Sequence, residues 1–124
     1  MNMVLIGLED RTYQKGQELI EELQECYEVR FVQEGTFDVG FEVNREKYYK
    51  LRFGKSTIIG GYQICFRSRY LFTYRASSLL KTYSLRLNVW LMILKKYPVF
   101  MKSIRNKFVN HYVNKIFRPM MKQK

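Results

Sequence analysis

Apolar and polar residues alternate with a period of two along much of the first two thirds of the chain. The clearest stretches are 29–31, 38–43 and 82–87. This alternation is typical of strands with one buried face. Aromatic and β-branched residues favour further strands at 48–53, 57–59 and 70–74. Short polar links with a glycine separate them as turns, and residues 3–8 are compatible with one more strand. The pattern predicts roughly six to eight short strands between about residues 3 and 87.

The spacing of apolar residues changes to that of a helix at Asn88, a residue type that caps helix N-termini well. Apolar residues then recur at three- and four-residue steps up to Tyr97, and Pro98 interrupts this helix or begins the next. After it, an apolar stripe at steps of four has basic residues mainly beside it: Phe100, Ile104, Phe108, Tyr112 and Ile116. We expect an amphipathic basic helix that ends near Pro119.

The order of these elements indicates the fold class. The sequence predicts a β-rich part at about 3–87, followed by helices at about 88–97 and 99–119. Strands first and helices last is an α+β pattern, best matched by a small barrel or jelly roll with helices at one end. A length of 124 residues fits one domain that spans 1–124.

Charge is distributed unevenly along the chain. The formal net charge is +11, yet all eleven acidic residues lie between Glu9 and Glu46, and residues 47–124 contain none. A basic, aromatic-rich chain is a reason to consider nucleic-acid binding. The basic C-terminal helix is equally a reason to consider contact with anionic lipid headgroups.

Residue counts exclude several classes of chemistry. Two cysteines, Cys26 and Cys65, do not make a disulfide scaffold, and a single histidine, His111, excludes a multi-histidine metal site. We expect the cysteines to be small buried hydrophobes and His111 to be a packing or surface residue. The glutamates between Glu18 and Glu28 are typical of a solvated surface. No signal peptide or membrane span is visible, so a cytosolic setting is predicted. Because these residues form no convincing catalytic group, we expect no enzymatic activity.

One glycine-containing segment is more informative than the rest. Ile59-Gly60-Gly61-Tyr62 precedes Arg67 and Arg69. Glycines let the backbone approach a ligand, successive amides cradle phosphate oxygens, and an arginine can neutralise the phosphate. The alternative is a simple turn followed by a basic surface.

The ordered combination of four segments resembles the cyclic-nucleotide-binding domain. Tyr13–Ile20 looks like that family's early glycine turn and strand, and Glu28–Gly40 looks like its central hairpin. Ile59–Tyr62 stands where the family has its phosphate-binding cassette, and Leu94–Pro98 resembles the junction of its last two helices. The resemblance implies an eight-stranded β-roll followed by two C-terminal helices, of which the last acts as a lid.

The same resemblance implies a set of ligand-binding residues and raises a conflict. The implied set is Gly60, Gly61, Tyr62, Arg67, Arg69 and Arg75, and the ligand would be cAMP or cGMP. However, Tyr62 stands where the family has a glutamate for the ribose hydroxyl, and no acidic residue follows Glu46. Some family members bind no nucleotide and fill the pocket with an aromatic side chain. The residues that fit this role here are Tyr62, Tyr70 and Phe72.

Within the family, the stretches 34–44 and 72–76 look closest to the cytoplasmic domains of voltage-gated potassium-type channels, possibly of the ciliate type. The resemblance implies a regulatory module on the cytoplasmic side of a membrane, as part of a tetrameric cation channel. It would sense a cyclic nucleotide or act as a self-liganded gating or assembly domain. The alternative function is a basic nucleic-acid-binding domain.

Overall fold

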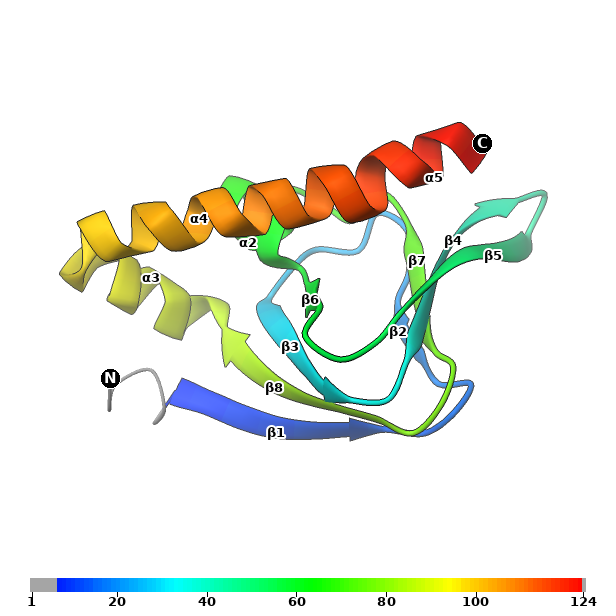
Figure 1. Ribbon diagram of the computed structural model, residues 1–124, viewed down its shortest axis with the longest axis horizontal. Helices are drawn as coiled ribbons and strands as arrows, with labels where there is room; N and C mark the ends of the chain where they lie inside the picture. Colours follow the sequence, from blue (N-terminus) through cyan, green and yellow to red (C-terminus); the bar gives the residue numbers. More distant parts are fainter. Residues whose placement is uncertain (1–6, 124) are drawn as a thin grey trace.

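The computed structural model describes residues 7–123, which form two four-stranded antiparallel sheets and a group of helices (Figure 1). The first sheet has the order β1 (Leu8–Tyr13), β8 (Leu80–Arg86), β3 (Glu28–Glu34) and β6 (Ile58–Ile59). The second has the order β2 (Glu18–Ile20), β7 (Thr73–Ala76), β4 (Phe37–Val43) and β5 (Glu46–Phe53). This confirms the predicted β-roll followed by C-terminal helices.

The helices lie along one side of the roll. A short helix, α2 (Gly61–Phe66), separates β6 from β7, and α3 (Leu87–Lys96) continues directly from β8. The chain then turns into a long rod made of α4 (Pro98–Tyr112), a π-helical segment η1 (Val113–Phe117) and α5 (Arg118–Gln123). In Figure 1 the rod runs along the upper edge of the molecule, from the end next to α3 to the end next to the β4–β5 hairpin.

The last helix does not end near Pro119, so that part of the prediction is wrong. A proline lacks the N–H group of an α-helical bond, and its ring conflicts with the carbonyl four residues earlier. Here the segment directly before Pro119 is π-helical, and the Arg118 N–H donates to the Val113 carbonyl five residues back. The wider turn changes which carbonyl stands below the proline ring, so the rod continues to Gln123.

Other boundaries differ from the sequence prediction in smaller ways. Helix α3 begins at Leu87, with Arg86 rather than Asn88 as the capping residue. Strand β7 begins at Thr73, because the Tyr70 N–H and carbonyl bond instead to Gln24 and Leu23 in the β2–β3 loop. The strand considered at residues 3–8 lies mostly outside the described residues, and only its last residue belongs to β1.

The first sheet has two different faces, which is what positions the site. Residues directly opposite each other on antiparallel strands share a face. Phe31 of β3 pairs with Tyr83 of β8 on the face that packs under α3 and α4. Arg30 pairs with Ser84 on the opposite face, which looks into the roll. Both faces are covered, so β3 is more buried than a half-exposed strand would be.

Candidate functional site

The segment between β6 and β7 has the position of the predicted phosphate-binding cassette, and we call residues 59–72 the cassette. It begins at Gly60, whose φ of 88° lies in the left-handed region, continues through α2, and leaves the helix at Arg67 with a φ of 53°. The Arg67 N–H donates to the Gln63 carbonyl and closes the last turn. The sequence did not indicate the helix between the two turns.

Both cassette glycines are required by contacts within the protein. A Cβ at Gly60 would stand 2.4 Å from the Tyr70 hydroxyl oxygen and 2.9 Å from the Glu28 carbonyl oxygen. A Cβ at Gly61 would stand 2.8 Å from Cγ of Phe108, so α2 and α4 pack against each other with only a hydrogen between them. Close packing alone therefore accounts for both glycines. Their predicted role in holding a phosphate stays a prediction.

The three candidate arginines do not converge on one point. Arg67 is exposed at the end of α2. Arg69 is turned toward the β2–β3 loop, where it donates to the Leu23 carbonyl oxygen at 2.9 Å and to Oε1 of Glu25 at 2.9 Å. Both partners of the Arg69–Glu25 pair are about half exposed, so the pair is weak and open to competition by another anion.

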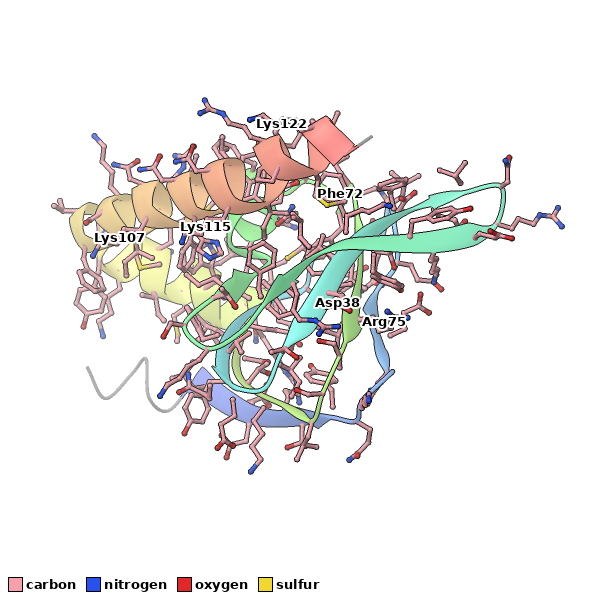
Figure 2. All side chains as sticks on the ribbon, turned by 45° about the vertical axis from the view of Figure 1, so that its right-hand side comes forward. Asp38, Phe72, Arg75, Lys107, Lys115 and Lys122 are labelled. Carbon is pink, nitrogen blue, oxygen red and sulfur yellow. The ribbon has the colours of Figure 1, made fainter. Side chains whose placement is uncertain are left out.

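Arg75 lies on the outer face of the second sheet, beside a buried carboxylate (Figure 2). Its Nη2 is 3.5 Å from Oδ2 of Asp38, and its guanidinium stacks 3.8 Å above the centroid of the Tyr49 ring. Arg52 makes the shorter contacts with Asp38, donating from Nε at 2.8 Å and from Nη2 at 3.2 Å. Arg75 is therefore engaged in a surface cluster, away from the cassette arginines.

The Asp38 cluster predicts a pH dependence of stability. Burial raises the pKa of Asp38, but the hydrogen bonds and charge of Arg52, with help from Ser77 and Arg75, bring the pKa below its ordinary value. The stabilisation is therefore complete above the unfolded-state pKa of about 3.9 and is lost as the pH falls through the lower folded-state pKa. We expect Asp38→Asn to reduce the unfolding free energy at pH 7 by about 1–2 kcal/mol.

Urea unfolding of the wild type and of Asp38→Asn between pH 7 and pH 3 checks this expectation. The difference between them should shrink below about pH 4. Glu42→Gln, an exposed change on the same strand, is the matched control and should alter stability by less than about 0.5 kcal/mol. A difference that persists undiminished at the acidic end would contradict the assignment of the effect to the Asp38 charge.

The aromatic residues of the cassette are packed into the protein. The Tyr62 ring stacks on the Tyr112 ring of α4 with centroids 4.8 Å apart, which ties the cassette to the rod. Tyr70 and Phe72 are almost fully buried in the core. Tyr70 meets Tyr74 edge-on at 5.6 Å and donates its hydroxyl to Sγ of Cys26 at 3.5 Å. Of the three aromatics proposed as pocket fillers, Tyr62 thus contacts the rod, whereas Tyr70 and Phe72 lie in the core.

The rod covers this region like a lid. Its inward residues are buried: Met101, Phe108, Tyr112, Ile116 and Met120. Tyr112 also packs against Phe117, and the end of the rod reaches β5. In the described conformation the lid is closed on the cassette.

Several buried polar atoms of the cassette and of the lid lack a hydrogen-bond partner among the described residues. They are Oε1 of Gln63 and Oγ of Ser68 in the cassette, and Nε2 of His111 and the Tyr112 hydroxyl in the lid. Gln63 and Tyr112 are neighbours, but the amide oxygen and the hydroxyl form no well-aligned bond. Burial, with a smaller contribution from Tyr62, raises the pKa of Tyr112 to about 12, so the hydroxyl stays neutral. Unsatisfied buried groups are uncommon, and a water or a ligand would satisfy these.

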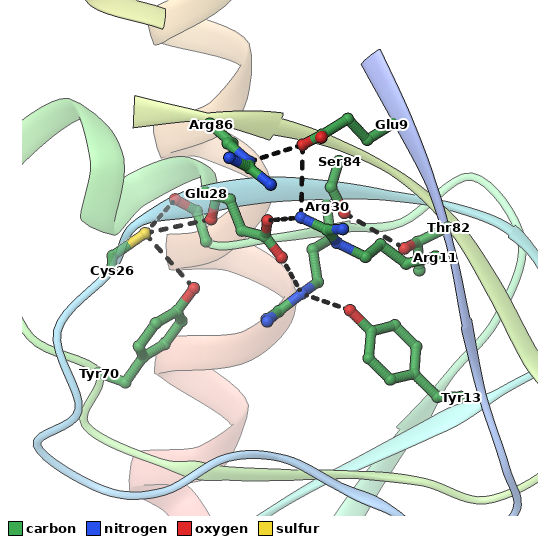
Figure 3. Close-up of polar contacts among 11 residues, drawn as sticks. Glu9, Arg11, Tyr13, Cys26, Glu28, Arg30, Tyr70, Thr82, Ser84 and Arg86 are labelled. Atoms are coloured by element: carbon green, nitrogen blue, oxygen red, sulfur yellow. Dashed lines mark hydrogen bonds and ion pairs between the residues drawn. The ribbon is translucent and has the colours of Figure 1, made fainter. Parts of the chain in front are cut away.

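The inner face of the first sheet carries a polar network that the sequence analysis missed (Figure 3). Arg30 is its centre and donates from Nε to the Tyr13 hydroxyl and to Oε2 of Glu28, both at 3.0 Å. Arg11 holds the other oxygen of Glu28 at 3.1 Å. Burial lowers the pKa of Arg30, but Tyr13, Tyr70 and Glu28 raise it by more, so the guanidinium remains charged inside the roll. The alternation around Arg30 predicted only an exposed position.

The cysteines and the histidine show no sign of catalytic chemistry. Cys26 is buried and Cys65 is half-buried, and burial raises the pKa of the Cys65 thiol to about 11. Burial and the charge of Lys115 lower the pKa of His111, so it is neutral at pH 7. Among residues 7–123, no three His, Cys, Asp or Glu side chains are grouped as a metal site requires.

Comparisons with known proteins identify the fold. No protein-family model and no curated protein matches the sequence. A protein described as a candidate cyclic nucleotide-binding protein from Geobacter metallireducens superposes with a TM-score of 0.78 at 10% identity, over 93% of this chain and 83% of that chain. The catabolite activator protein of Thermus thermophilus gives 0.72 at 11% identity, over 95% and 54%. The cAMP-bound protein PfPKA-R gives 0.64 at 16% identity, over 70% and 31%.

These matches define the class of structure. The chain has the fold of cyclic-nucleotide-binding domains, an eight-stranded antiparallel roll followed by C-terminal helices. The identities are low, so the likeness concerns the fold and leaves the ligand and the biological context open to proposal.

Proposed function

We propose that the protein is a regulatory module of the cyclic-nucleotide-binding fold whose ligand space is occupied by its own aromatic side chains. The observation that carries this proposal is the direct stacking of Tyr62 on Tyr112, which joins the cassette to the lid. The burial of Tyr70 and Phe72 supports it. So does the arrangement of the arginines, since Arg69 is bonded to Leu23 and Glu25.

Regulation by such a module would operate through the position of the lid. A partner, ligand or modification that binds the open and closed states with different affinity shifts the equilibrium by that difference. The closed state is held by the ring contacts between the cassette and the lid. A non-enzymatic role is part of this proposal.

A second candidate function is the sensing of cAMP or cGMP. The unsatisfied buried groups of Gln63, Ser68, His111 and Tyr112 favour it, because an opened lid would present them to a ligand. The weakness of the exposed Arg69–Glu25 pair also favours it, since a cyclic phosphate would compete with Glu25 for the guanidinium.

Thermal unfolding of the full chain in millimolar cAMP or cGMP distinguishes the two functions. The self-occupied module is expected to show no shift in melting temperature. A ligand present at about 100 times its dissociation constant would stabilise the protein by about 2.7 kcal/mol, which a melting curve detects easily. Such a shift would overturn the self-occupied proposal and establish nucleotide sensing.

A second readout tests the closed lid itself. Tyr62→Ala is expected to speed amide exchange in α4 and η1, because it removes the ring that stacks on Tyr112. Tyr27→Ala, which removes an exposed ring on the β2–β3 loop, is the matched control and should leave that exchange unchanged. If amide exchange in α4 and η1 is equally fast in both variants, the stacking of Tyr62 on Tyr112 is not what holds the lid closed.

The biological context remains a further proposal. The sequence resemblance and the charge support four such proposals: a cytoplasmic location, membership of a potassium-type channel, tetrameric assembly, and contact of the basic C-terminal helix with anionic lipid. The net charge of +11 keeps nucleic-acid binding as the alternative. Salt-dependent retention on nucleic acid would favour that alternative, and light scattering on the purified chain tests tetramer formation.

A further inference from the structure

The corner where α3 meets α4 exposes an unusual amount of apolar surface. We call residues 91–102 the α3–α4 corner. Val99 is 85% exposed and Phe100 is 56% exposed. Four more apolar residues of the corner are also exposed: Leu91, Met92, Leu94 and Tyr97. The corner projects from one end of the molecule, at the left in Figure 1. Contiguous exposed apolar residues on a soluble surface mark an interaction site.

The apolar residues of the corner are mixed with lysines. Lys95, Lys96 and Lys102 are all exposed. None of them takes part in the ion pairs formed within residues 7–123. The corner also belongs to the stretch after Glu46 that contains no acidic residue. Its positive charge is therefore available to an anionic partner.

An apolar cavity of about 800 Å³ lies behind the corner, between the two helices and the outer face of the first sheet. Ile93, Tyr97, Phe100 and Met101 belong both to the corner and to the cavity lining. The remaining wall is mainly apolar and aromatic, with Phe31, Leu85 and Trp90 among its residues. Lys107 is the charged residue of the lining. A cavity of this size and polarity accepts an apolar chain and holds its polar end at the charged residue.

We propose that the α3–α4 corner docks onto a membrane surface that contains anionic phospholipid. Val99 and Phe100 enter the boundary between headgroups and acyl chains, the lysines meet the phosphates, and the cavity receives an acyl chain. None of the helices in the described part of the chain combines the length and apolar character needed to cross a bilayer, so the contact is peripheral. This docking does not depend on whether a nucleotide binds.

Charge complementarity is the reason for choosing a membrane as the partner. Two copies of the chain meeting through this corner would bring Lys95, Lys96 and Lys102 of each against those of the other, which is unfavourable. A nucleic acid would match the lysines but would leave Val99 and Phe100 in water. An anionic bilayer satisfies the lysines and the apolar residues together.

Co-sedimentation of the full chain with vesicles tests the proposal. Binding is expected to vesicles of phosphatidylcholine with phosphatidylserine, and much weaker binding to phosphatidylcholine alone. Each lysine near an anionic surface contributes about fivefold, so Lys95→Glu with Lys102→Glu should lower partitioning by at least about 25-fold. Lys115→Glu with Lys122→Glu makes the same change in charge at the other end of the rod and should lower it by less than about threefold (Figure 2).

A second pair of variants tests the apolar part of the site. Val99→Ser with Phe100→Ser is expected to lower partitioning at least about tenfold. Leu23→Ser with Tyr27→Ser removes two equally exposed apolar residues elsewhere and should have little effect. These four positions are on the surface, so melting curves of the variants should match the wild type.

Other occupants of the corner give different results. Equal loss in the two lysine variants would place the contact along the whole helix and overturn the proposal. A dimer that light scattering detects, and that the Val99 and Phe100 changes disrupt, would also overturn the proposal. A nucleotide-induced melting shift is measured separately and leaves each of these outcomes unaffected.

Discussion

Phe108→Ala is expected to lower the free energy of unfolding by about 3–5 kcal/mol. Phe108 is 5% exposed and connects four elements through one ring. From α4 it stacks on Trp90 of α3 at 5.6 Å, meets Phe31 of β3 at 6.0 Å, and packs onto Gly61 at the start of α2. Its removal opens a cavity where the lid, the cassette and the first sheet meet. The expected loss is a large part of the stability of an ordinary domain.

Urea unfolding with a constant m-value measures this loss. Phe108→Leu keeps most of the side-chain volume and is the matched control, with an expected loss below about 1.5 kcal/mol. Hydrogen exchange should show the largest acceleration in α4 and α2, since these helices share the ring. A cost below about 1 kcal/mol for Phe108→Ala would mean that the lid does not rest on the cassette as described.

Tyr70→Ala is expected to be nearly as damaging, at about 3–5 kcal/mol. Tyr70 is 2% exposed, contacts Tyr74 edge-on and fills the space above Gly60. Burial is also the main reason that its pKa lies well above the ordinary value, so the phenol is neutral throughout the range of pH in which the protein is studied. The expected loss is therefore a loss of ring packing and not the loss of a charge on Tyr70.

Tyr70→Phe separates the ring from the hydroxyl. Within residues 7–123 the hydroxyl donates to the thiol of Cys26 alone, which is a weak acceptor at 3.5 Å. We therefore expect Tyr70→Phe to cost less than about 1 kcal/mol, as measured by thermal unfolding beside Tyr70→Ala. Similar losses in both variants would show that the hydroxyl contact, and not ring packing, dominates.

The periodic parts of the fold were predictable from the spacing of apolar residues. Apolar residues alternate along β4 and located the strand, although its first five residues are all buried. The four-residue stripe of the last helix marked the side on which Phe108 and Tyr112 are buried. The glycine pair was also located correctly as a special backbone position, since Gly60 has a positive φ. What a positive φ cannot reveal is whether the glycine faces a ligand or another side chain.

The remaining features depend on contacts between distant segments. Helix α2 has only six residues, too few for an amphipathic period, and its N-cap and first residue are the glycines Gly60 and Gly61, which are unfavourable in helices. Arg30 stands at a position that alternation assigns to water, yet the second sheet covers it. The stacking of Tyr62 on Tyr112 depends on how the rod lies across the roll. None of these follows from a local pattern.

The π-helical segment has a geometrical consequence for the lid. In an α-helix each residue turns by about 100°, so a step of four overshoots one full turn by about 40°. A stripe spaced by four from Ile104 to Met120 would therefore drift by about 160° and wind to the opposite side of a regular helix. Phe108, Tyr112, Ile116 and Met120 nevertheless all remain buried. The wider π-helical turn at η1 holds more residues than an α-helical turn, so it absorbs part of the overshoot. This segment therefore sets which side of the last helix faces the roll.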